Sequence, residues 1–250
     1  MALLTGTFLF GACLPASTPV PLPTDTSMPT ETATPTPTVI WFPPTATPTP
    51  FPTRASSPTP DLRPDLGEIL LTDDFSSGSA WQLDQNASGS VALGKNEITI
   101  ALKAPEARMS SVRSKPVLGS FYAEITASPT LCKGADEYGL LFRVSSPQDF
   151  FRFSLSCDGR ARLDRVVGGT ASSPQPWTEA GAVPPGAPSI NRLAIWVNGR
   201  EMHFFVNDIY LFSVSDPMLP QGTLGVFARS AGENAVTVSF SDLVVRSLKD

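Results

Sequence analysis

Residues 191–214 read NRLAIWVNGREMHFFVNDIYLFSV and carry the most regular pattern in the chain. Apolar side chains alternate with other side chains along three short runs, which is the period of a strand with one buried face. The dipeptides Asn198-Gly199 and Asn207-Asp208 separate the runs, and these residue types tolerate the positive φ angles of tight hairpin turns. The stretch therefore predicts an antiparallel meander of three strands.

The same alternation recurs throughout residues 66–250, where no stretch of ten or more residues has the 3.6-residue period of an amphipathic helix. Asp158-Gly159 marks a further tight turn. About a dozen short strands with regular turns predict an all-β domain of two sheets, either a sandwich or a barrel. The predicted strands are 68–75, 96–102, 120–127, 138–145, 149–156, 160–166, 191–197, 201–206, 209–214, 222–228 and 235–246.

Proline divides the chain into two parts. Fifteen of the 26 prolines lie between Leu14 and Asp65, in a tract of repeated Thr-Pro units such as 34–38. Proline fixes φ and lacks a backbone donor, so this tract favours extended polyproline II and not a packed core. Residues 14–65 are therefore predicted to be a disordered Pro/Thr/Ser-rich stalk, and 66–250 to be the folded domain.

Residues 1–13 resemble an export signal. Ala2–Ala12 is apolar and uncharged but is too short to cross a bilayer, which needs about 20 residues. The ending Gly11-Ala12-Cys13 resembles the lipobox of bacterial lipoproteins. That resemblance implies export, lipidation of Cys13 and anchoring at the bacterial cell surface or membrane exterior. The alternative is a cytosolic protein with an apolar N-terminus.

The charge of the chain argues against a nucleic-acid partner. The formal net charge is −5, whereas phosphate binding draws its affinity from clustered Lys and Arg. One local group of arginines, at 152, 160, 162 and 165, is the exception. Charges spread over two neighbouring strands are more often a solvated face than a binding site.

The chain has three cysteines, and Cys13 belongs to the signal-like segment. Cys132 precedes one predicted strand and Cys157 ends the next, so export predicts a disulfide between them. Such a bridge would tie a loop to a neighbouring hairpin. A zinc site is less favoured, because two cysteines without a nearby histidine leave the metal's coordination incomplete.

Several segments of 66–250 carry a family resemblance. They are Asp73-Asp74-Phe75 with Trp81, Tyr138–Arg143, Phe150–Phe153 with Asp158–Arg160, Asn191–Leu193 with Val197–Gly199, Val206–Asp208, Gly222–Val226 and Phe240–Leu243. In this order they resemble the concanavalin A-like domains of bacterial surface proteins, including the laminin G-like group and the group described as family 16 glycoside hydrolase-like or 3-keto-disaccharide hydrolase. The resemblance implies a jelly-roll sandwich that binds carbohydrate or a cell-surface protein on its concave face or loop rim.

The sequence favours binding over catalysis. Family 16 glucanases carry a Glu-x-Asp-x-x-Glu strand for retaining hydrolysis, and this chain has no such triplet. His203 is the sole histidine, and no serine or cysteine stands in a nucleophile elbow. A non-catalytic binding module is thus the first hypothesis. A sugar-processing hydrolase of the 3-keto-disaccharide type using Glu124, Glu201 or His203, and a purely structural spacer, are the alternatives.

Five side chains are candidates for ligand contact. Arg143 and Arg152 have the parity of non-core positions, so we expect both to be accessible in one shallow groove near Trp196 and His203. Trp177, in a proline-rich loop, could close over such a site or cap the core. Aromatic planes and forked donors are what sugars require for stacking and hydrogen bonding.

Calcium is a candidate cofactor. Many jelly-roll domains bind a calcium ion where the first and last strands meet. The candidate ligands in this chain are Asp73, Asp74 and Asp242. The alternative, given more weight, is that these aspartates start turns and strand edges.

Overall fold

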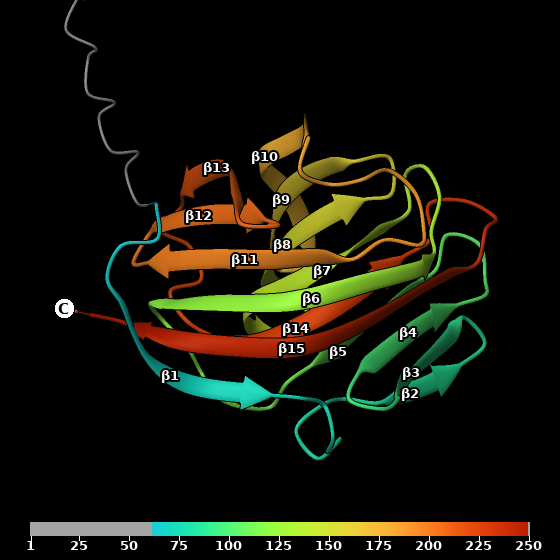
Figure 1. Ribbon diagram of the computed structural model, residues 1–250, viewed down its shortest axis with the longest axis horizontal. Helices are drawn as coiled ribbons and strands as arrows, with labels where there is room; N and C mark the ends of the chain where they lie inside the picture. Colours follow the sequence, from blue (N-terminus) through green and yellow to red (C-terminus); the bar gives the residue numbers. More distant parts are fainter. Residues whose placement is uncertain (1–61, 250) are drawn as a thin grey trace, which may run out of the picture. The chain divides into compact units, whose positions relative to one another are not determined.

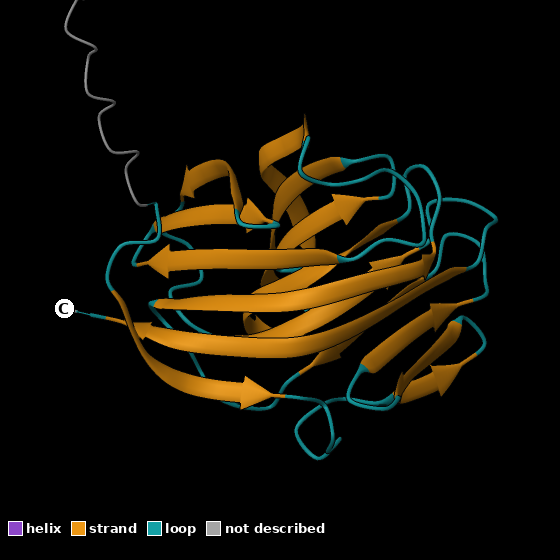
Figure 2. Ribbon diagram, in the orientation of Figure 1, coloured by secondary structure: helices purple, strands orange, loops and turns teal. Residues whose placement is uncertain are grey.

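The computed structural model describes residues 62–249, which form two antiparallel sheets packed against each other and contain no helix (Figure 1, Figure 2). The expected all-β sandwich is confirmed. Cys13, the signal-like segment and residues 14–61 of the expected stalk lie outside the described residues. Within 62–249, no helix is long and apolar enough to cross a membrane.

The first sheet has nine strands in the order β13-β12-β11-β6-β15-β4-β3-β2, with β1 also paired to β15. The long strand β15 pairs with β6 along one edge and with both β4 and β1 along the other (Figure 1). The strands are β1 (Leu66–Asp73), β2 (Asp84–Asn86), β3 (Gly89–Leu93), β4 (Ile98–Leu102), β6 (Phe121–Leu131), β11 (Asn191–Asn198), β12 (Glu201–Val206), β13 (Ile209–Ser215) and β15 (Val236–Leu248).

The second sheet has six strands in the order β10-β9-β8-β7-β14-β5 and lies behind the first in Figure 1. Its two edges are β10 and β5, which come from distant parts of the chain. The strands are β5 (Arg108–Val112), β7 (Glu137–Ser146), β8 (Asp149–Ser156), β9 (Arg160–Val167), β10 (Thr170–Glu179) and β14 (Thr223–Arg229).

The core lies between the sheets and follows from the alternation of side chains. Ile125, Leu193 and Phe204 of the nine-stranded sheet pack in one cluster with Phe142 and Val226 of the six-stranded sheet, and all five are fully buried. Burying each such side chain stabilises the fold by about 1.5–3 kcal/mol. The opposite face of each sheet, here called its outer face, carries the residues in between.

The meander predicted over 191–214 is confirmed as β11, β12 and β13. Gly199, Asn207 and Asp208 have positive φ angles of 54°, 51° and 65°. The residue types that suggested tight turns therefore occupy the left-handed conformation those turns require.

Four strands were absent from the sequence prediction: β2, β3, β5 and β10. Strand β10 contains Pro174 and Pro176 and was predicted to be a loop. Proline cannot donate to a central ladder, but β10 is an edge strand with two register shifts against β9, a position where proline is tolerated. Strand β5 has the serine-rich sequence RMSSV, which weakens its apolar alternation.

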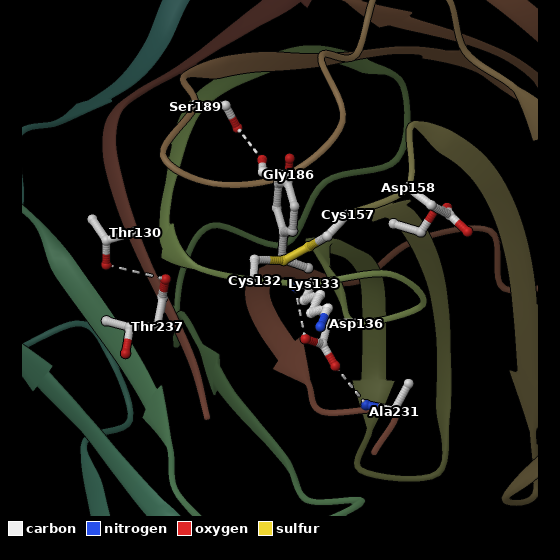
Figure 3. Close-up of a disulfide and its surroundings, with 12 residues drawn as sticks. Thr130, Cys132, Lys133, Asp136, Cys157, Asp158, Gly186, Ser189, Ala231 and Thr237 are labelled. Carbon is white, nitrogen blue, oxygen red and sulfur yellow. Dashed lines mark hydrogen bonds between the residues drawn. A yellow bond between two sulfur atoms is a disulfide. The ribbon is translucent and has the colours of Figure 1, made fainter. Parts of the chain in front are cut away.

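The expected disulfide joins Cys132 to Cys157, with their Cα atoms 5.8 Å apart (Figure 3). Cys132 directly follows β6 of the nine-stranded sheet, and Cys157 directly follows β8 of the six-stranded sheet. The bridge thus links the two sheets, whereas the sequence analysis expected it to tie a loop to a neighbouring hairpin. Beside it, the Asp136 carboxylate accepts hydrogen bonds from the Lys133 and Ala231 amides, each at 2.9 Å (Figure 3).

Candidate functional site

A groove of about 500 Å³ lies on the outer face of the six-stranded sheet. Strands β5, β14, β7 and β8 supply most of its lining, and the turn between β7 and β8 and two loop segments supply the rest. The lining residues are Gln82, Arg108, Ser110, Val112, Arg113, Ser114, Leu141, Val144, Ser145, Ser146, Pro147, Phe150, Arg152, Thr223 and Phe227.

Strand alternation explains how apolar surface reaches this groove. Leu140 and Phe142 point into the core, so Leu141 between them faces outward. Phe227 also lines the groove, beneath the guanidinium of Arg152, whose Cζ lies 5.6 Å from the ring centroid. Phe150 is half-buried and presents its ring to the groove. The groove therefore offers aromatic carbon next to a cation.

An ion-pair network crosses the same face of the sheet. Arg152 Nη2 lies 2.5 Å from the Asp164 carboxylate, and Arg229 Nη1 lies 2.6 Å from the Glu137 carboxylate. Arg162 Nη2 lies 3.1 Å from each of these two carboxylates and so connects the pairs. Both carboxyl groups are almost fully buried, and charges held in this way are costly to unpair. The network holds Arg152 in place at the groove.

Arg108 differs from its neighbours. It is exposed in the groove lining, and its guanidinium has no ion pair or hydrogen bond among residues 62–249. Partial burial, together with the positive charges of Arg152 and Arg229, lowers the pKa of Arg108 from its ordinary value. Arginine remains protonated in proteins, so the groove contains a cation without a partner in the described part of the chain.

Six neutral polar side chains line the groove with Arg108, and three of them are Gln82, Ser110 and Ser114. None of the side-chain atoms of these three residues takes part in a hydrogen bond with another described residue. An amide and two hydroxyls can each donate and accept. Together with Arg108 they supply donors for several oxygen atoms of one ligand.

Contrary to the expectation from the sequence, Arg143 does not lie beside Arg152 on the outer face. It is only 1% exposed, and its Nη2 donates to the carbonyl oxygens of Gly119, at 2.9 Å, and Gly199, at 2.5 Å. Its backbone has a φ of 49°, and the pairing of β7 with β14 shifts register between Leu141 and Val144, where three steps along β7 lie opposite two along β14. This bulge adds a residue and reverses the parity, so Arg143 reaches the nine-stranded sheet and does not share a groove with Arg152.

Trp196 and His203 also lie away from the groove, on the outer face of the nine-stranded sheet. Trp196 is buried, and its Nε1 donates to the Pro64 carbonyl at 3.0 Å. His203 Nδ1 lies 2.7 Å from the Leu62 carbonyl oxygen, and the two rings stack with centroids 4.7 Å apart. The chain at 62–64 covers both rings, so the expectation that they adjoin the arginine groove is wrong.

Trp177 lies on β10 and not in a loop. Its ring is half-buried against the guanidinium groups of Arg160 and Arg162, whose Cζ atoms lie 5.3 and 4.4 Å from the ring centroid. Cation–π contacts of this kind hold the indole against β9. Trp177 therefore packs on the sheet surface beside the ion-pair network and does not line the groove.

The three aspartates considered for calcium have other partners. Asp73 accepts a hydrogen bond from Trp81 Nε1 at 3.0 Å and forms an ion pair with Arg113 at 2.9 Å. Asp74 accepts from a backbone amide two residues later, and Asp242 accepts from the hydroxyl of the preceding serine. Within residues 62–249 no group of three His, Cys, Asp or Glu side chains could hold a metal ion. The hydrogen bonds of Asp73 and Asp74 to amides two residues later fit the alternative that these aspartates start turns, and calcium binding stays a prediction.

The sequence analysis missed Arg108, Ser110 and Phe227 as groove residues. Arg108 and Ser110 lie on β5, which was not predicted as a strand. Phe227 lies in the predicted strand 222–228 but was not among the candidate site residues, although Leu224 and Val226 already fill the inward positions. The alternation within 223–229 was the signal that could have placed Phe227 outside.

Comparison with known proteins identifies the fold. No protein-family model and no curated protein sequence matches the chain. A Bacillus subtilis protein of unknown function with a galectin-like fold superposes with a TM-score of 0.56 and 14% identity, over 74% of this chain and 99% of that one. The carbohydrate-binding module CBM66 from Bacillus subtilis gives 0.54 and 14%, over 67% and 96%.

The catalytic domain of an endo-1,3-β-glucanase (laminarinase) from Thermotoga petrophila gives a TM-score of 0.53 and 10% identity, over 74% of this chain and 99% of that one. At such low identity these likenesses show a shared fold. The domain is a jelly-roll sandwich of the concanavalin A-like kind.

Proposed function

We propose that the domain is a non-catalytic module that binds carbohydrate in the groove on the outer face of the six-stranded sheet. The observation that carries this proposal is the composition of the groove. Phe150 offers an aromatic ring, Arg108 a forked cation, and Ser110 and Ser114 two hydroxyls, and no residue of 62–249 forms a hydrogen bond or ion pair with these three polar groups. Sugars are bound by stacking on aromatic carbon and by hydrogen bonds to their hydroxyl groups.

The shared fold supports the same proposal. One structural neighbour is described as a carbohydrate-binding module and another as a laminarinase catalytic domain. Folds host many functions, so this likeness adds to the groove chemistry and does not replace it.

Binding is favoured over hydrolysis because of what lines the groove. The described lining contains no aspartate or glutamate, the groups that usually act in pairs on a glycosidic bond. The residues considered for a hydrolase lie elsewhere. Glu124 accepts a hydrogen bond from the Tyr122 hydroxyl at 2.8 Å on the nine-stranded sheet, Glu201 is exposed at the start of β12, and His203 is covered by the chain at 62–64.

We further propose that the domain is presented outside the cell, tethered by a lipid on Cys13 through the Pro/Thr-rich segment 14–65. The lipobox-like Gly11-Ala12-Cys13 and the proline content of 14–65 support this proposal. A module held near a membrane or cell wall would meet polysaccharide there.

The test uses a variant of the full chain in which a bulky side chain occupies the groove. Ser110 is exposed on β5, so Ser110→Trp should fold normally but place an indole over the bound sugar's position. Ser213→Trp is the matched control, because Ser213 is an exposed strand residue on the other sheet. Both variants and the wild type are applied to a glycan array, and the affinity for each glycan that binds is measured by calorimetry.

We expect wild type and Ser213→Trp to bind the same glycans, and Ser110→Trp to lose at least about tenfold in affinity, equivalent to 1.4 kcal/mol. An array without hits for the folded wild-type chain would overturn the carbohydrate proposal. Equal binding by both tryptophan variants would place the site elsewhere.

A further inference from the structure

The face that bears the groove carries an excess of positive charge. Arg108, Arg152, Arg162 and Arg229 surround only two carboxylates, Glu137 and Asp164. Within the groove lining itself three arginines occur and no acid. This contrasts with the whole chain, whose formal net charge is −5. A local excess of positive charge therefore lies on one face of an acidic protein.

The pairing of these arginines shows which one remains available. Arg152 binds Asp164, and Arg113, the third arginine of the lining, binds Asp73. Only Arg108 among the lining arginines has no ion pair with a described residue. Arg229 lies opposite Arg108 in the β14–β5 register and binds Glu137 with its guanidinium. Among residues 62–249 no carboxylate forms an ion pair with Arg108, and Glu137 and Asp164, which attract it, are already paired with other arginines.

We propose that the groove binds a carboxylated sugar, such as a uronic acid residue of an acidic polysaccharide, with its carboxylate paired to Arg108. This inference rests on the proposed function and names its ligand class. The planar fork of arginine matches a carboxylate with two parallel hydrogen bonds. Gln82, Ser110 and Ser114, in the same lining, are placed to bind the hydroxyl groups of the same sugar, and Phe150 presents a ring.

A neutral sugar would not use this arrangement fully. It would cover Arg108 and remove water from the guanidinium without supplying an opposite charge, and an unpaired charge loses solvation when it is covered. A carboxylate supplies that charge and also offsets the repulsion from Arg152 and Arg229, which exceeds the attraction of Glu137 and Asp164 for Arg108. Acidic sugars should accordingly bind more tightly than neutral ones of the same shape.

The experiment compares matched polysaccharides on the full chain. The probes are polygalacturonate, alginate and hyaluronan, each with its carboxyl-reduced neutral counterpart, together with dextran sulfate and unmodified dextran. Binding is measured for wild type, Arg108→Gln and Arg108→Lys. Arg200→Gln is the matched control, because Arg200 is an exposed arginine in the β11–β12 turn of the other sheet.

We expect wild type and Arg200→Gln to bind at least one carboxylated probe at least tenfold more tightly than its reduced counterpart. Arg108→Gln should lose about ten- to a hundredfold in affinity for that probe and keep its weaker affinity for the neutral form. Arg108→Lys should recover only part of the loss, because lysine lacks the planar fork. Affinity of the wild type should fall as salt rises from 0.05 to 0.5 M.

Other outcomes separate the two proposals. Equal affinity for acidic and reduced probes would overturn the carboxylate inference and leave carbohydrate binding standing. Equal binding of dextran sulfate and the carboxylated probes would show general polyanion attraction and would also overturn it. A folded wild-type chain that binds none of the probes would overturn this inference, while the glycan array decides on the proposed function.

Discussion

At Arg143 a single backbone conformation decides what the side chain can do. Strand alternation predicted that it would lie beside Arg152 on the outer face. The left-handed φ of 49° and the bulge between Leu141 and Val144 turn it toward the carbonyls of Gly119 and Gly199 instead. The bulge is accommodated by Gly222, where a Cβ would lie 2.3 Å from the Arg143 carbonyl carbon. Sequence alternation cannot reveal this bulge, because the close approach of Gly222 to Arg143 joins residues that are distant in the sequence.

This placement predicts an unusual order of stability for substitutions at Arg143. Arg143→Ala should destabilise the domain by about 1–3 kcal/mol, because the Gly119 and Gly199 carbonyls lose a charged donor from a buried side chain. Arg143→Gly loses the same hydrogen bonds but adopts a positive φ without strain, so it should be about 1 kcal/mol more stable than Arg143→Ala. Urea unfolding of both variants measures the difference. An alanine variant as stable as the wild type would show that the guanidinium contributes nothing to the tie between the sheets.

At the scale of elements, strands with clear alternation and turn dipeptides were predictable, and strands defined by their partners were not. Strands β11 to β13 have Asn-Gly and Asn-Asp turns and were found from the sequence. Strand β10 forms by pairing with the outer edge of β9, and strand β5 forms by pairing with the outer edge of β14. Prolines in β10 and serines in β5 hide them from local rules. The groove was missed for this reason, since β5 supplies Arg108 and Ser110.

The disulfide between the ends of β6 and β8 carries a prediction at this scale. It closes a loop with a sequence separation of 25 residues. In the chain-entropy description such a cross-link stabilises the folded state by about 3–4 kcal/mol. The double variant Cys132→Ser/Cys157→Ser should therefore unfold at lower urea concentration than the wild type. Adding dithiothreitol should lower the wild-type midpoint and leave the double variant unaffected. Identical midpoints for all samples would contradict a stabilising bridge.

For the whole molecule, the sandwich was predictable because every strand with one buried face must cover it against another. The sequence did not predict which outer face carries the groove. Both sheets have aromatic and polar outer residues, and the sequence analysis expected Arg143 and Arg152 to share one groove with Trp196 and His203. The chain at 62–64 covers those two rings, whereas the face with Arg108 is left open. The difference depends on where a segment preceding the domain lies.

Tethering gives a second prediction at this scale. If Cys13 is lipidated, a palmitate analogue supplied to an expressing bacterium should label the full chain and leave Cys13→Ala unlabelled. The variant chain should also leave the membrane fraction. Cys132 and Cys157 are bonded to each other and provide no alternative acceptor in the oxidised domain. Equal labelling of both chains would refute the lipoprotein assignment.

Hydrogen exchange in the presence of ligand tests most directly whether the groove is the binding site. The full chain is compared with and without the array glycan of highest affinity, with the Ser110→Trp chain as the blocked reference. Binding in the groove should slow exchange at amides of β5, β14 and the turn between β7 and β8, and should leave β11 and β12 unchanged. Slowed exchange confined to β11, β12 and the chain at 62–66 would contradict the account and move the site to the outer face of the nine-stranded sheet.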